Sequence, residues 1–391
     1  MRRSPARPAS VQRARRTPLL GSIGASEAAN ARRCRVGTPN NPRTGGRRLG
    51  SRAGLVRTLV VSDLHLGARL GRDVLRERSA LAALLDALDG VDRLVLLGDT
   101  VELLEGRPRS AMAVAEPVLR ALGGALGPDR EVVVVPGNHD RELIHRWLDA
   151  HAGALGVDTV VPPGASRELA AVVDWLAPAR VTVRYPGVWL ADGVWGTHGH
   201  YLDRHLLPES AFGIARGLLG RRPRDLLSAA DYEKGPHLTG LEAFLTGHLP
   251  RVLSALLDDL AGGLRAGAMT RSPAVVHGRL VRGLAPVAAH ALGIQMRRAA
   301  IPALAQVVAH LNADADAVVF GHVHRLGPRA ADDPAEWAGL EGAPRIYNTG
   351  CWVHEPLLLA RARPPHPYWP GGAVLVDGGE PRALSLLEDQ A

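Results

Sequence analysis

Apolar, β-branched runs and leucine stripes alternate along residues 55 to 150 of this chain. The runs have the length and composition of buried strands, and they cover residues 58–62, 93–97 and 132–135. The stripes have helical spacing, and they predict helices over residues 74–88, 111–122 and 142–151. Because each step from strand to strand is long enough for one β-α-β unit, we expect a parallel sheet whose strand ends lie side by side.

The rest of the chain completes a mixed pattern of the α/β (α+β) class. Short strand patterns, broken by Gly and Pro turns, cover residues 157–161, 181–184, 188–191 and 194–196, with a short helix over 170–176. Further strand patterns cover residues 318–320, 345–348, 373–376 and 384–387. Residues 201–312 differ, because Leu and Ala recur there at helical spacing and strand signals are absent. We therefore expect a helical insertion or cap over about residues 201–312.

Five of the apolar runs end in residue types that bind metal ions. The segments that follow them are Ser62-Asp63-Leu64-His65, Gly98-Asp99, Gly137-Asn138-His139-Asp140, Thr197-His198-Gly199-His200 and Gly321-His322-Val323-His324. Packing does not require such side chains at the end of a hydrophobic strand, whereas ligands bind at the carboxyl ends of strands in open α/β sheets. The candidate metal ligands are Asp63, His65, Asp99, Asn138, His198, His322 and His324.

This set of seven nitrogen and oxygen donors is too large for one closed tetrahedral zinc site. It suits two divalent ions about 4 Å apart, which activate water against phosphate esters. Asp99 is the natural carboxylate to bridge them. Carboxylate and imidazole donors without thiolates favour Mn²⁺, Fe or Zn²⁺ over Cu(I). The sequence therefore predicts a dinuclear metal site.

The five motifs, in this order, resemble those of the calcineurin-like metallophosphoesterases over about residues 55–325. The resemblance implies a four-layer α/β/β/α sandwich with the metals at the strand ends. It implies that the first metal is held by Asp63, His65, Asp99 and His324. It implies that the second metal is held by Asp99, Asn138, His198 and His322.

The resemblance also implies a reaction, in which metal-activated hydroxide attacks phosphorus in line. His139 would lie near the leaving-group oxygen as general acid or electrostatic stabiliser, with Asp140 orienting its ring. The substrate would be a phosphate mono- or diester, or a pyrophosphate. Intact ligands and His139 argue against the alternative of a non-catalytic scaffold.

Three further residues are candidates for substrate contacts, each with a plainer alternative. His200 either contacts substrate phosphate or hydrogen-bonds a loop. Arg325 either pairs with phosphate or lies on the surface. Asn348 either hydrogen-bonds substrate or a ligand, or forms a turn. The residues after the His-Gly-His run, Tyr201, Asp203, Arg204 and His205, either line the pocket mouth or begin a solvated helix.

The insertion resembles, in its place, the short helical insertions of UDP-2,3-diacylglucosamine hydrolases, which hold acyl chains. Ser62-Asp63-Leu64-His65-Leu66 is also similar to that branch, whereas Gly137-Asn138-His139 differs from its Arg-bearing motif. A lipid-linked substrate and peripheral membrane contact are therefore one alternative. A soluble cap or a dimer interface is the alternative that we favour. The sequence does not predict the oligomeric state.

Charge and composition divide the chain into a tail, residues 1–52, and a metallophosphoesterase domain, residues 53–391. The tail holds thirteen Arg and one acid, a net charge of +12, which leaves −4 of the overall +8 for the rest. Because the tail lacks hydrophobic periodicity, we expect it to be disordered. It is either an idle tail, a nucleic-acid-binding arm or a targeting segment. A nuclease of the same fold is disfavoured, because the domain is acidic and only 4% of residues are aromatic.

Two cysteines, one of them in the tail, make a structural disulfide improbable. No apolar run is long enough to cross a membrane. These features predict a cytoplasmic protein.

Overall fold

The computed structural model describes residues 56–105, 107–206, 226–234, 299–339, 344–359 and 362–390. All of them belong to one compact unit, Gly54–Ala391. The predicted tail, and residues 207–225 and 235–298 of the predicted insertion, lie outside the described residues. No described helix has the length and apolar character that crossing a membrane requires.

The larger sheet has seven strands in the order β11-β10-β1-β2-β3-β5-β4. Its strands are β1 Thr58–Val61, β2 Arg93–Leu97, β3 Glu131–Val135, β4 Thr159–Val160, β5 Arg180–Tyr185, β10 Gly372–Asp377 and β11 Glu380–Ser385. The neighbours β1, β2, β3 and β5 are parallel, as the alternating pattern predicts, and antiparallel strands close both edges. The carboxyl ends of β1, β2 and β3 therefore meet at one edge of this sheet.

The smaller sheet has four strands in the order β6-β7-β8-β9. Its strands are β6 Gly187–Ala191, β7 Val194–Thr197, β8 Ala317–Phe320 and β9 Arg345–Asn348. β7, β8 and β9 are parallel, so the carboxyl ends of β7 and β8 are also neighbours. β6 pairs with β7 in the antiparallel sense.

Side chains of the first three strands alternate between two cores. Leu59 and Val61 of β1 point into a core shared with helices, whereas Val60 points into a core shared with the smaller sheet. Leu96 and Val95 of β2 divide in the same way, because successive strand side chains leave opposite faces. The two sheets thus pack face to face, which explains why these strands are apolar at every position after the first.

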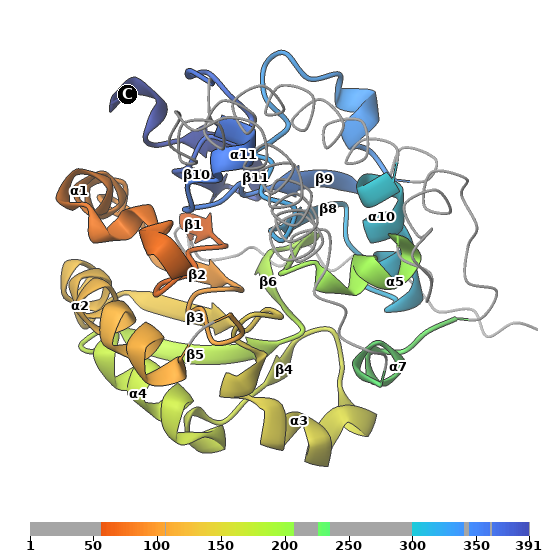
Figure 1. Cartoon of the computed structure of the whole chain (residues 1–391). Helices are drawn as coiled ribbons and strands as arrows, with labels where there is room; N and C mark the ends of the chain where they lie inside the picture. Colours follow the sequence, from red (N-terminus) through yellow and green to blue (C-terminus); the bar gives the residue numbers. More distant parts are fainter. Residues whose placement is uncertain are drawn as a thin grey trace, which may run out of the picture. The chain divides into compact units, whose positions relative to one another are not determined.

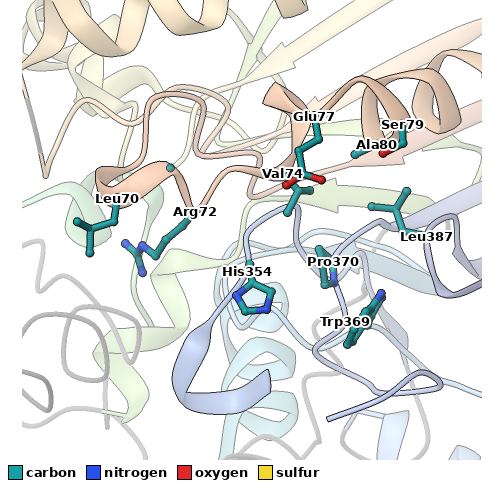
Figure 2. Close-up of a pocket in the computed structure, with 11 residues that line it drawn as sticks. Leu70, Arg72, Val74, Glu77, Ser79, Ala80, His354, Trp369, Pro370 and Leu387 are labelled. Carbon is teal, nitrogen blue, oxygen red and sulfur yellow. The ribbon is translucent and has the colours of Figure 1, made fainter. Parts of the chain in front are cut away.

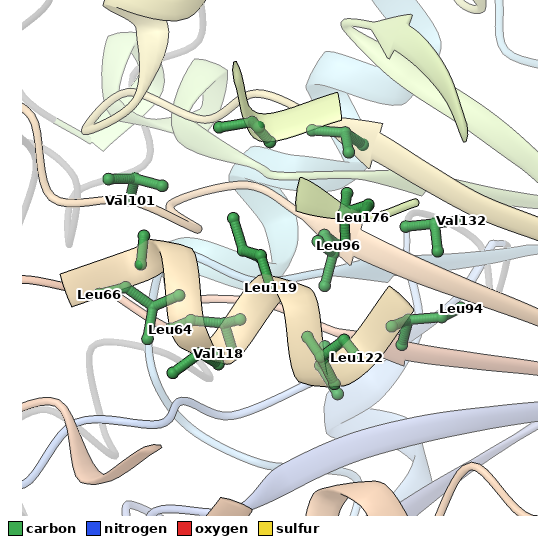
Figure 3. Packing of buried hydrophobic residues seen from close by; sticks show 14 of the residues in the cluster. Leu64, Leu66, Leu94, Leu96, Val101, Val118, Leu119, Leu122, Val132 and Leu176 are labelled. Carbon is green, nitrogen blue, oxygen red and sulfur yellow. The ribbon is translucent and has the colours of Figure 1, made fainter. Parts of the chain in front are cut away.

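Helices cover the outer faces of both sheets. On the larger sheet they are α1 Arg78–Asp86, α2 Pro108–Leu126, α3 His145–His151 and α4 Arg167–Trp175. Figure 3 shows Leu119 and Leu122 of α2 packed against Leu94 and Leu96 of β2. The smaller sheet is covered by α10 Ile301–His310, with α5 Asp203–Leu206 and α7 Ala229–Glu233 beside it (Figure 1). The predicted mixed α/β class is confirmed, with four layers in the order α/β/β/α.

Short elements complete the chain. The last α-helix is α11 Pro356–Leu359. The 3₁₀ helices are η1 Arg69–Gly71, η2 Val74–Arg76, η3 Arg141–Leu143, η4 Ala152–Ala154, η5 Pro163–Ala165, η6 His200–Leu202, η9 Pro334–Trp337 and η11 Glu388–Gln390.

Several predicted elements differ in their bounds, and two of the differences have a clear cause in the backbone. The single helix predicted over residues 74–88 is split, because Glu77 is extended between η2 and α1. The strand predicted over residues 384–387 begins earlier, at Glu380, since Gly378 and Gly379 both have positive φ and turn the chain back onto β10. Neither difference moves a candidate ligand.

Candidate metal centre

The first group of predicted ligands follows β1 and β8. Ligand atoms of Asp63, His65 and His324 lie within 4.8 Å of one another, and all three side chains are buried. His324 Nε2 lies 3.2 Å from Asp63 Oδ1, and His65 Nε2 lies 4.0 Å from the same oxygen. Residues about 260 positions apart in the chain thus face one another, with three donors that suit a divalent cation.

The second group follows β2, β7 and β8. Ligand atoms of Asp99, His198 and His322 also lie within 4.8 Å of one another and are buried. Asn138 joins them from the end of β3, with its Oδ1 3.0 Å from His198 Nε2. Asp99 Oδ2 lies 3.1 Å from His198 Nε2 and 3.8 Å from His65 Nε2. Asp99 therefore lies between the two groups, where a bridging carboxylate has to be.

The buried polar atoms of this site fit divalent metal ions. Within the described residues, Asn138 Nδ2 and His322 Nδ1 have no hydrogen-bond partner, and Asp99 Oδ2 faces imidazole nitrogens of the two groups. A buried polar atom without a partner is costly unless it binds a ligand. His198 Nδ1 lies 3.0 Å from the carbonyl oxygen of Leu97, an arrangement that leaves Nε2 for a cation. The donor set therefore fits the predicted metals.

Charge around Asp99 points the same way. Burial alone would raise the pKa of Asp99, but His198, His139 and His65 together hold it well below its ordinary value. Burial alone would lower the pKa of His198, but Asp99, Asp63 and Asp140 raise it to about 9. Positive charge therefore keeps the carboxylates ionised. That charge comes either from protons on the imidazoles or from a cation bound by the same atoms.

The ligand loops are held in an uncommon backbone conformation. Asp63, His65, Asp99, His322 and His324 all have positive φ, between 43° and 68°. Each such residue costs about 1–3 kcal/mol and persists only where the surroundings impose it. Here the loops after β1 and β2 bond to each other, from the amides of Asp63 and His65 to the carbonyls of Gly98 and Asp99. Strain of this kind gathers at functional sites.

Two motif glycines leave room for the ligand carboxylates. A Cβ on Gly137 would lie 2.3 Å from Asp99 Oδ1, and one on Gly321 would lie 2.4 Å from Asp63 Oδ2. The amides that follow then reach the same carboxylates: His139 N donates to Asp99 Oδ1 at 2.8 Å, and His322 N donates to Asp63 Oδ2 at 3.0 Å. Glycine is required there because the backbone passes too close for any side chain.

Glu102 is a functional candidate that the sequence analysis missed. Its Oε2 lies 2.9 Å from His65 Nδ1 and 2.8 Å from His139 Nδ1, and it is buried with them. Burial alone would raise the pKa of Glu102, but the hydrogen bonds from His139 and His65 lower it to about 2. The available signal was its position three residues after Asp99, on the loop after β2. An ionised Glu102 fixes both rings with Nδ1 protonated and Nε2 facing the site.

Asp140, which we expected to orient the His139 ring, bonds to two backbone amides. Asp140 Oδ1 accepts from the amide of Gly137 at 2.6 Å and Oδ2 from that of Thr100 at 2.7 Å. Burial and the nearby Asp99 raise the pKa of Asp140 to about 6. Because its oxygens bond to backbone amides, Asp140 braces the loops after β2 and β3, and Glu102 contacts the His139 ring instead.

Two of the three predicted substrate contacts are engaged elsewhere. Arg325 is buried, donates to both oxygens of Asp332 at 2.7 and 3.1 Å, and lies over the Trp337 ring. Asn348 is fully buried, donates to the carbonyl of Gly321 at 2.6 Å and accepts from the amide of Gly350. Both side chains therefore hold the loops behind the ligands.

His200 remains next to the second group. Its ring centroid is 5.6 Å from that of His198 and 6.5 Å from that of His322. Its Nε2 lies 3.3 Å from the hydroxyl of Tyr185, so the plainer alternative of a local hydrogen bond is present as well.

A pocket of about 470 Å³ is lined by residues other than the candidate ligands (Figure 2). Arg72 and His354 line one part of it, with Glu77, Trp369 and Leu387 in the remainder. Arg72 already pairs with Glu105 and Glu355. None of the predicted site residues lines this pocket, so the chemistry does not centre on it.

Comparisons with known proteins bear on the family. Residues 56–234 match the family model of the calcineurin-like phosphoesterases. No curated protein matches this chain. Among solved structures, the chain is similar to a cold-active protein-tyrosine phosphatase of a psychrophilic Shewanella species, at 12% identity. The match covers 85% of this chain and 78% of that one with a TM-score of 0.30, which is too low to carry an argument.

The family match ends before the last motif, so His322 and His324 join the site through geometry alone. The match covers four of the five loops that carry predicted ligands, namely those after β1, β2, β3 and β7. Together with the two buried groups that these loops form with the loop after β8, the match identifies residues 56–234 as a calcineurin-like phosphoesterase region.

Proposed function

We propose that this protein hydrolyses a phosphate mono- or diester, or a pyrophosphate, with two divalent metal ions bound by the two groups described above. The observation that carries the proposal is the position of Asp99 Oδ2, within 4 Å of imidazole nitrogens from both groups. One carboxylate between two sets of donors is the arrangement that two-metal hydrolysis needs. The match of residues 56–234 to the phosphoesterase family model supports the same reaction.

The first ion would be held by Asp63, His65, Asp99 and His324. The second would be held by Asp99, Asn138, His198 and His322. When bound, such ions supply an activated water and stabilise negative charge on the phosphate oxygens. Imidazole and carboxylate donors favour Mn²⁺, Fe or Zn²⁺.

His139 would supply the proton. Its Nδ1 bonds to Glu102, so its Nε2 is the atom directed to the site. The ionised Glu102 favours the doubly protonated ring, which can give the Nε2 proton to the leaving-group oxygen. Asp140 would act on this step indirectly, by bracing the loop that carries Asn138 and His139. His200, beside the second group, is the one of the three proposed substrate contacts that we retain.

The substrate class is tested with metal-loaded protein. Protein stripped with a chelator and reloaded with Mn²⁺, Fe²⁺ or Zn²⁺ is assayed on p-nitrophenyl phosphate, bis-p-nitrophenyl phosphate and a nucleoside diphosphate ester. Single-stranded DNA tests the nuclease alternative. We expect metal-dependent release of product from at least one small ester. Two bound ions per chain with no hydrolysis of any ester would overturn the proposal.

A further inference from the structure

Glu233, the last residue of α7, ends in a buried cluster of hydrogen-bond donors. Its Oε2 accepts from Arg141 Nη2 at 2.9 Å and from Nε at 3.2 Å. Its Oε1 accepts from the hydroxyl of Tyr201 at 2.5 Å and from that of Tyr185. One carboxylate from the segment between β7 and β8 is therefore bonded to three side chains, of which Arg141 and Tyr185 lie outside that segment.

Arg141 connects this cluster to the candidate metal centre. It directly follows Gly137-Asn138-His139-Asp140, the loop that begins where β3 ends. Besides Glu233, it donates from Nη1 to His145 Nδ1 at 2.9 Å. The Arg141 side chain thus joins α7 to the loop that carries Asn138 and His139.

The two tyrosines connect the cluster to the neighbouring ligand loop. Tyr185 lies beside His200, and Tyr201 follows His200 directly and stacks on Tyr232 of α7 with ring centroids 4.6 Å apart. Burial and the charge of Glu233 raise the pKa of both hydroxyls well above the ordinary value, so they remain donors. Glu233 therefore contacts both sides of the site, after β3 and after β7.

Helix α7 is itself fixed in place. Ser228 and Asp231 form a capping box at its start, with Ser228 N donating to Asp231 Oδ2 at 3.0 Å. The helix packs against η4, which follows α3 (Figure 1). A helix held by its own cap and by η4 can hold Arg141 in a defined place.

We propose that Glu233 and Arg141 form a positioning pair, through which the segment between β7 and β8 holds the loop 137–141 in its reactive geometry. This inference rests on the proposed two-metal hydrolysis. Neither residue touches the reacting atoms. Removing one partner takes the opposite charge away from a largely buried ion pair. This loosens the loop, and small displacements of catalytic groups cost up to about a hundredfold in rate.

The test combines kinetics with amide hydrogen exchange on full-length protein loaded with Mn²⁺. In Glu233→Gln and in Arg141→Gln, we expect kcat on bis-p-nitrophenyl phosphate to fall about tenfold or more, with KM changed less than about threefold. Deuterium uptake in a peptide spanning residues 137–141 should rise several-fold. In the double variant, the loss of kcat should be no larger than in the worse single variant, because the two residues act as one unit.

The matched control is Glu388→Gln. Glu388 forms a comparable two-pronged pair with Arg329, also largely buried. This variant should lose thermal stability and leave both kcat and uptake at residues 137–141 unchanged. Glu233→Asp, which retains the charge, should recover part of both signals and serves if Glu233→Gln does not fold.

Unchanged kcat and unchanged uptake at residues 137–141 in folded Glu233→Gln would overturn the inference. A fall in melting temperature alone would do the same, because it would mean that the pair only stabilises the fold. If wild-type protein hydrolyses no ester, the proposed function fails, while the exchange comparison still decides whether Glu233 holds the loop.

Discussion

His322 Nε2 lies 3.1 Å from each carboxylate oxygen of Asp203. The two residues are 119 positions apart, and both are buried. The contact fixes the ring so that Nδ1, rather than Nε2, faces Asp99 and His198. Asp203 therefore orients the ring of His322, as the Leu97 carbonyl orients the ring of His198.

Replacing Asp203 by Asn should weaken the second metal site. The amide can still accept one hydrogen bond, but it no longer enforces the ring orientation or raises the basicity of Nδ1. We expect a loss of about 10- to 100-fold in affinity for one of two Mn²⁺ ions, measured by calorimetric titration. Asp158→Asn, which removes a carboxylate paired with Arg184, is the control and should bind both ions as wild type does. Equal affinities in the two variants would contradict the role of Asp203.

Replacing Asp99 by Ala should release both ions and abolish hydrolysis, because one carboxylate serves both groups. Elemental analysis after loading should find well under one ion per chain. The control is Asp92→Ala. Asp92 precedes the first residue of β2, at the end away from the site, and accepts a hydrogen bond from the Arg57 amide. This variant should retain two ions. Loss of a single ion in Asp99→Ala would mean that Asp99 belongs to one group only.

Replacing Glu102 by Gln should lower kcat more than it lowers metal content. The amide cannot stabilise a doubly protonated His139. Its NH2 group must also face either the two Nδ1–H donors or the backbone amides of Leu104 and Glu105, so one pair of donors loses its acceptor. We expect kcat to fall about 10- to 100-fold, as is typical for partners of ligand and catalytic histidines. The exposed Glu142, changed to Gln, is the control. A Glu102→Gln enzyme with wild-type kcat and pH profile would show that Glu102 has no part in proton transfer.

Stability should fall as the pH drops from about 6.5 toward about 4 because of His205. Its ring bonds to Gln306 and Tyr232, and burial and the nearby His310 lower the pKa of His205 from 6.5 to about 4. In that window the unfolded chain binds a proton that the folded chain does not, so acidification favours unfolding. Melting temperatures between pH 7 and pH 5 should fall less steeply in His205→Gln than in wild type. The exposed His151, changed to Gln, should leave the slope unaltered; a wild-type slope in His205→Gln would refute the assignment.

Removing residues 1–52 should alter neither melting temperature nor turnover. Their Arg-rich composition cannot bury a hydrophobic core. Thermal unfolding and steady-state kinetics of a chain that begins at Ala53 test this directly. A drop of several degrees, or a several-fold loss of kcat, would mean that the tail docks on the domain.

Much of the fold and the seven candidate ligands could be predicted from the sequence, for a local reason. Strand runs and the polar residues that end them are contiguous in the chain, and parallel neighbours bring such ends together. The apolar run from Val132 to Val135 predicts both the strand and its burial on two faces. Asn138 could then be placed beside Asp99 without any knowledge of side-chain contacts.

Only the tertiary structure decided which side chains support those ligands. The partners of Glu102, Asp203 and Glu233 lie 37, 119 and 92 residues away, so no local pattern identifies these contacts. Arg325 and Asn348 have the right chemistry for a substrate, yet Asp332 and the Gly321 carbonyl already engage them. The reason is physical: each buried polar group takes the partner that packing brings within about 3 Å, and that proximity is set by the whole fold rather than by local sequence.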